Sequence, residues 1–72
     1  MTYLSPDDIL HLSAGELIPD LKILGDRLRY DGLDRSEVEA MAEALITRLL
    51  AETDPLAHEE LIYTLETAYE SQ

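Results

Sequence analysis

The chain has 72 residues, so we expect a single acidic helical domain over residues 1–72, near the lower size limit for independent folding. Because it has no cysteine, it can form neither a disulfide framework nor a thiolate metal site. Sixteen acidic against five basic residues give a formal net charge of −11, which argues against direct binding to nucleic acid or to an anionic membrane surface and favours a basic partner. No apolar run reaches the roughly 20 residues of a membrane span and no basic segment leads an apolar one, so we expect no membrane span, no signal peptide and a cytoplasmic location.

Two serines mark the beginnings of the first two expected helices. Ser5 as N-cap, with Pro6 at the first helical position, predicts a short helix over about residues 6–12. Ser13 and Glu16 have the S-x-x-E spacing of a capping box, in which each residue caps a backbone N–H of the other. A second helix therefore begins close behind the first.

Pro19 complicates this second helix, because a proline in a helix interior costs about 3 kcal/mol. We expect either a short turn at 14–18 followed by a helix from Pro19, or one helix kinked there. Gly32 in "YDG" is the expected left-handed cap at its end. The helix has a single apolar stripe at 4-3-4 spacing, formed by Leu17, Leu21, Leu24 and Leu28.

The third and fourth helices have clear beginnings. Asp34 is the expected N-cap of the third helix, and Leu33 and Val38 stand at the hydrophobic-staple positions. Asp54 and Pro55 are the expected N-cap and first residue of the fourth. The expected apolar positions are Val38, Met41, Ala42, Leu45, Ile46, Leu49 and Leu50 in the third helix, and Leu61, Ile62, Leu65, Ala68 and Tyr69 in the fourth.

No stretch alternates between apolar and polar residues with period two, so the pattern predicts an all-α fold. We expect a small antiparallel bundle of three main helices plus the short N-terminal one. Because the connections are short, consecutive long helices are expected to be antiparallel neighbours.

The C-terminal half resembles a HEAT-type repeat, in which an amphipathic helix ends, an Asp-Pro turn follows and a second amphipathic helix packs back. The resemblance covers about residues 44–69. It implies a helical hairpin that serves as a structural module. The residues that carry it are Leu49, Leu50, Asp54, Pro55, Leu61, Ile62, Leu65 and Ala68.

The size, acidity and helix count also resemble those of small bacterial immunity proteins that block toxin nucleases. The segment "ETDPLAHEELIY" is similar to the acidic, tyrosine-bearing recognition segment of the colicin DNase immunity family, with Tyr63 as the tyrosine. This resemblance implies a protein that inhibits a basic toxin by binding it.

Residues suited to catalysis or metal binding are few. "HEELI" begins like the zinc motif H-E-x-x-H, but Ile62 stands where the second histidine is required. His58 shares a face with the apolar residues of its helix and is expected to be packed, and its i, i+4 neighbour Asp54 adds only one further metal ligand. Ser36 is displaced by one position from the D-S-L motif of acyl carriers. We therefore expect no enzyme, no cofactor and no metal.

One acidic stripe on the fourth helix is the candidate binding surface, with an acidic pair on the third helix. Like charges at i, i+4 destabilise a helix slightly, and glutamates near a helix C-terminus oppose its dipole. A local cost without a local gain indicates binding, although a simply solvated face is the alternative. Tyr63 would be a rigid anchor within a charged rim. The candidate partner-binding residues are Glu39, Glu43, Glu59, Tyr63, Glu66 and Glu70.

The sequence leads to two main hypotheses about function. The first is a non-catalytic acidic protein that binds and inhibits a basic protein, such as a toxin or a nucleic-acid-binding protein, with a nucleic-acid mimic as the extreme form. The second is a HEAT-like structural module that self-associates as a homodimer through apolar surface. Salt discriminates between them, because ionic strength weakens electrostatic binding and leaves apolar association intact.

Overall fold

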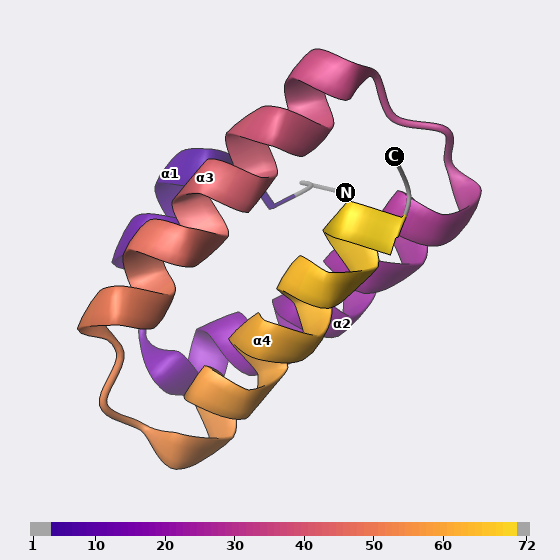
Figure 1. Cartoon of the computed structure of the whole chain (residues 1–72). Coiled ribbons are helices and arrows are strands. Elements are labelled where there is room, and N and C mark those ends of the chain that lie inside the picture. The colour runs from indigo at the N-terminus through magenta and orange to yellow at the C-terminus, as the bar shows by residue number, and fades with distance from the viewer. Residues whose placement is uncertain (1–3, 71–72) are drawn as a thin grey trace.

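The computed structural model describes residues 4–70, and all regular secondary structure within that range is helical. The helices are α1 (Pro6–His11), α2 (Ala14–Tyr30), α3 (Arg35–Ala51) and α4 (Pro55–Glu70). In Figure 1, α2 and α4 run in the same direction and α3 runs back against both. The expected small all-α bundle with one short N-terminal helix is confirmed.

The neighbours of each helix differ in part from those expected. The most extensive contact joins α2 to α4, α4 also packs on α3, and α1 packs on α3. Contact between α2 and α3 is slight at most, although only residues 31–34 separate them. The expectation that they pack as neighbours is therefore wrong. A short loop fixes the directions of two helices, but it does not prevent a third helix with small buried side chains, here Ala57 and Ala68, from becoming the main partner.

The helices begin where the sequence predicts, but the side chains of two expected N-caps, Ser13 and Asp34, make no capping hydrogen bond. The Ser5 hydroxyl accepts from the Asp8 N–H and the Asp8 carboxylate accepts from the Ser5 N–H, both at 3.2 Å, which is a complete capping box. Asp54 Oδ1 caps α4 by accepting from the backbone at positions 56 and 57. The capping box expected at Ser13 is wrong, because its hydroxyl instead donates to the Glu16 carboxylate at 2.8 Å.

α2 is one helix that continues through Pro19. The missing N–H of Pro19 would have bonded the carbonyl of Gly15, which is exposed, so water can solvate that oxygen. The helix ends as expected, with Gly32 in the left-handed region at φ 60° directly after the C-cap Asp31.

The core confirms the leucine stripe of α2 and corrects the apolar faces of α3 and α4. All four leucines of the stripe are buried, together with Leu45 and Leu61. Several expected core residues are instead exposed: Ile46 (38%), Leu50 (84%), Ile62 (39%) and Tyr69 (56%). Their places in the core are taken by Ala44, Ala57, Thr64 and Thr67.

The physical reason for this correction is the position of α1 and α2. α1 covers the side of α3 that carries Ala44, and α2 covers the side of α4 that carries Thr64, so both buried faces are rotated towards those helices. The apolar arc of each helix is wider than the face that a small bundle can bury, and the surplus remains at the surface.

Candidate functional site

All six candidate partner-binding residues lie at the surface of α3 and α4, but they do not form one continuous patch. On α3, Glu43 lines a shallow groove together with Pro6 and Leu10 of α1. On α4, Tyr63 lines a pocket of about 180 Å³ between α4 and α2. The two residues therefore lie on opposite margins of the α3–α4 pair, whereas Glu59 and Glu66 occupy the outer surface of α4.

Tyr63 has a cationic neighbour on α2 that was not expected from the sequence. Arg29 of α2 donates to the Tyr63 hydroxyl at 2.9 Å, and its guanidinium carbon lies 5.7 Å from the centroid of the tyrosine ring. The hydrogen bond to this hydroxyl, followed by their Coulombic interaction, raises the pKa of Arg29. The interpretation of Tyr63 as an anchor surrounded by carboxylates is therefore wrong on its α2 side. Because Arg29 and Tyr63 are 34 residues apart, the spacing of neighbouring residues in the sequence could not predict this contact.

Every arginine of the chain contacts a group of the chain itself. Arg29 contacts Tyr63, and the other three form ion pairs four residues along the sequence, Arg27 with Asp31, Arg35 with Glu39 and Arg48 with Glu52. By contrast, none of Glu43, Glu59 and Glu66 has an ion-pair partner among residues 4–70. The intramolecular pairs thus compensate Glu39 on α3 but leave Glu43, Glu59 and Glu66 uncompensated.

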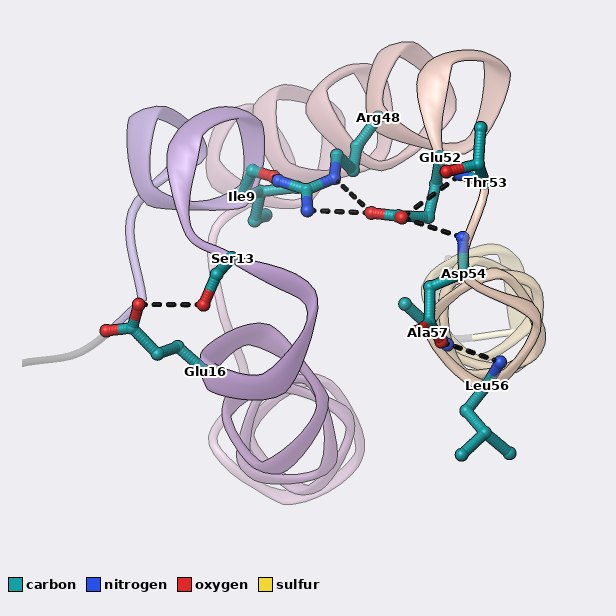
Figure 2. A network of polar contacts seen from close by, with 9 residues as sticks. All are labelled: Ile9, Ser13, Glu16, Arg48, Glu52, Thr53, Asp54, Leu56 and Ala57. Atoms are coloured by element: carbon teal, nitrogen blue, oxygen red, sulfur yellow. Dashed lines mark hydrogen bonds and ion pairs between the residues drawn. The ribbon is translucent and has the colours of Figure 1, made fainter.

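A network of hydrogen bonds surrounds Arg48 and Glu52 (Figure 2). Arg48 Nε and Nη2 donate to Glu52 Oε1 at 2.8 and 2.7 Å, and Arg48 Nη1 donates to the Ile9 carbonyl at 3.1 Å. Glu52 Oε2 accepts from the backbone N–H groups of Thr53 and Asp54 at 3.1 and 3.0 Å. The hydrogen bond from the Asp54 N–H, followed by that from Arg48, lowers the pKa of Glu52.

This network connects three parts of the fold: α1, the end of α3 and the α3–α4 turn. Both side chains are nearly buried, at 12% and 9% exposure, and their hydrogen-bonding groups point at protein atoms rather than outward. We therefore assign it a structural role. This network was not among the expected features, although an Arg and a Glu at i, i+4 beside an apolar run were its signal in the sequence.

The features considered for metal binding have other roles. Asp54 Oδ1 is used as the helix cap, and His58 is exposed, so its expected packing in the core is wrong. Among the residues that the structure describes, no three His, Cys, Asp or Glu side chains are arranged to hold a metal ion. Within the same range, none of the helices has the length and apolar character needed to cross a membrane.

Comparison with models of known protein families, with curated proteins and with solved structures finds no match. The resemblances to HEAT-type repeats and to immunity proteins therefore remain predictions.

Proposed function

We propose that this protein is a non-catalytic inhibitor that binds a basic protein partner through the outer surface of α3 and α4. The observation that carries this proposal is the imbalance of partnered and unpartnered charge. All four arginines are engaged within the chain, whereas Glu43, Glu59 and Glu66 are exposed without an ion-pair partner in residues 4–70.

Such a surface attracts a Lys- or Arg-rich partner at long range and suppresses acidic ones. A toxin or a nucleic-acid-binding protein has the required complementary charge, and blocking a phosphate-binding groove with carboxylates would inhibit it. The proposed mechanism is occlusion, because the partner's binding surface is covered by a folded domain.

The alternative is a HEAT-like structural module that forms a homodimer. It is favoured by one specific observation, the exposure of Ile46, Leu50, Ile62 and Tyr69 on α3 and α4. A homodimer held by these residues would persist at high salt, whereas the proposed inhibitor complex would dissociate.

Charge reversal on α4 tests the proposal. The variant Glu59→Lys/Glu66→Lys is used as bait in a low-salt lysate of the source organism, beside the wild type and the control Glu16→Lys/Asp26→Lys, which makes the same charge change at exposed positions of α2. We expect the wild type and the control to capture a basic protein that salt releases, and the α4 variant to fail to capture it. The activity of the captured protein is then assayed in the presence and in the absence of the wild-type chain.

Equal capture by all three baits would refute the α3–α4 surface as the interface. Capture of a basic protein whose activity is unaffected by wild type would refute inhibition. Circular dichroism of each variant verifies that its helical content is unchanged.

A further inference from the structure

Four of the exposed apolar residues of α3 and α4 lie near the junction of the two helices, whereas Leu56 and Tyr63 lie elsewhere on α4. On α3, Ala44 lies at the margin that faces α1, so Ile46, about 200° away around the helix, lies beyond the opposite margin, towards α4. Leu50 follows about 40° farther round, on the outer surface of α3. On α4, Tyr63 and Thr64 face α2, so Ile62 and Tyr69 lie beyond the margin towards α3.

Because α3 and α4 are antiparallel and in contact, these two margins meet. Leu49 and Leu65, which are half-buried and packed against the core, form the floor between them. We call this surface the α3–α4 seam, and it consists of Ile46, Leu49, Leu50, Ile62, Leu65 and Tyr69.

Unpartnered carboxylates lie on both sides of the α3–α4 seam. On α3, Glu43 is at about the azimuth of Leu50, farther from α4, because seven residues make almost two turns. On α4, Glu59 and Glu66 lie beyond Ile62, on the side away from α3. The seam is thus an elongated apolar strip edged by these three carboxylates, with the Arg35–Glu39 ion pair at the beginning of α3 in line with Ile46.

This arrangement determines which occupant fits. We propose that the α3–α4 seam binds an amphipathic helix of the partner, whose apolar face covers the seam and whose flanking Lys and Arg side chains meet Glu43, Glu59 and Glu66. The inference rests on the proposed function, since it specifies the element through which the basic partner is recognised. An amphipathic helix that packs its apolar face on a hydrophobic surface of another protein is an established recognition mode. Residues 4–70 offer no strand edge that an extended peptide could join.

Charge complementarity separates this occupant from a second copy of the chain. Two copies, each with a net charge of −11, would repel, and a two-fold contact across the seam would place acidic edges close to each other. A cationic helix turns the same edges into attraction. The 16 residues of α4 are about 24 Å long, which matches a partner helix of about four turns.

Two labelled peptides of identical composition test the proposal by fluorescence anisotropy. Both have 18 residues of leucine and lysine: one has leucines at i, i+3, i+4 and i+7 and so forms a cationic amphipathic helix, whereas the other has them scrambled so that no face forms. We expect wild type to bind the amphipathic peptide at least about tenfold more tightly than the scrambled one, with affinity falling as NaCl rises from about 50 to about 300 mM.

Matched variants locate the binding. Leu50→Gln/Tyr69→Gln removes the two most exposed seam residues, and Ile23→Gln/Tyr30→Gln removes two exposed residues of α2 as the control. We expect the seam variant to lose the preference for the amphipathic peptide and the control to keep it. Circular dichroism verifies that both variants are folded. The comparison of the two peptides is made on the wild type, so it remains valid even if a variant fails to fold.

The contrary outcomes are distinct. Equal affinity of wild type for both peptides, or an unchanged preference in the seam variant, overturns the seam while leaving charge-driven binding of a basic partner in place. Absence of binding by either peptide at low salt overturns the proposed function as well. A wild-type dimer in sedimentation that the seam variant converts to monomer shows that a second copy is the occupant.

Discussion

The orientation of α4 can be tested with two adjacent residues. Leu61 is fully buried, whereas Ile62, displaced by about 100° around the helix, is 39% exposed. Leu61→Ala removes a buried side chain and leaves a cavity, which costs about 2–5 kcal/mol. In a domain of 72 residues, whose total stability is about 4–11 kcal/mol, this loss is a large fraction.

For Ile62→Ala the same reasoning gives a much smaller cost. About three-fifths of the side chain is buried, so the lost transfer free energy is about 1–2 kcal/mol, and no enclosed cavity forms at a rim. Alanine also has the higher helix propensity, which offsets about 0.5 kcal/mol. The net loss is about 1 kcal/mol.

Urea unfolding followed by circular dichroism measures both values, provided that the slope with denaturant stays constant among the variants. We expect Leu61→Ala to be less stable than Ile62→Ala by at least about 1 kcal/mol. Equal losses, or a larger loss at Ile62, would show that α4 buries the face that simple apolar periodicity assigns to it, and would refute the exposed seam.

Two further predictions concern backbone and charge. Gly32→Ala should destabilise the protein by about 1 kcal/mol, because φ is 60° there, whereas Gly25→Ala, inside α2 with open space at its Cβ position, should stabilise it by about 0.5–1 kcal/mol; thermal unfolding distinguishes the two signs. Because the folded state lowers the pKa of Glu52, its contribution to stability is present above the pKa of the unfolded chain and is lost as the pH falls through the folded pKa. Wild type should therefore lose more stability than Glu52→Gln between pH 6 and pH 3, and parallel pH profiles of unfolding would contradict the role of the Arg48–Glu52 network.

The sequence predicted helices well and their buried faces only in part. The leucine stripe of α2 is narrow, so a single orientation buries it, and the prediction is confirmed. The apolar arc of α3 is broad, and the part of it that is buried depends on where α1 packs. That information is not local, because it comes from contacts such as the one between Arg48 and Ile9, 39 residues apart.

The candidate site shows the same limit. The exposure of the five glutamates of the candidate site could be predicted from helical spacing, and all five are exposed. The separation of Glu43 from Tyr63, and the contact of Tyr63 with Arg29, depend on which helices flank the α3–α4 pair. The apolar seam also escaped prediction, because its residues are the ones that periodicity assigned to the core.

The pairing of α2 with α4 has a consequence for how the chain acquires its structure. The main partner of the leucine stripe of α2 is α4, which follows α3 in the chain, so a nascent chain that ends near residue 51 lacks the helix that covers most of that stripe. Bringing α4 to α2 closes the chain segment between them, which costs conformational entropy before the contacts between α2 and α4 are gained. Folding during synthesis should therefore wait until α4 leaves the ribosome, and then proceed in one cooperative step without a stable N-terminal subdomain.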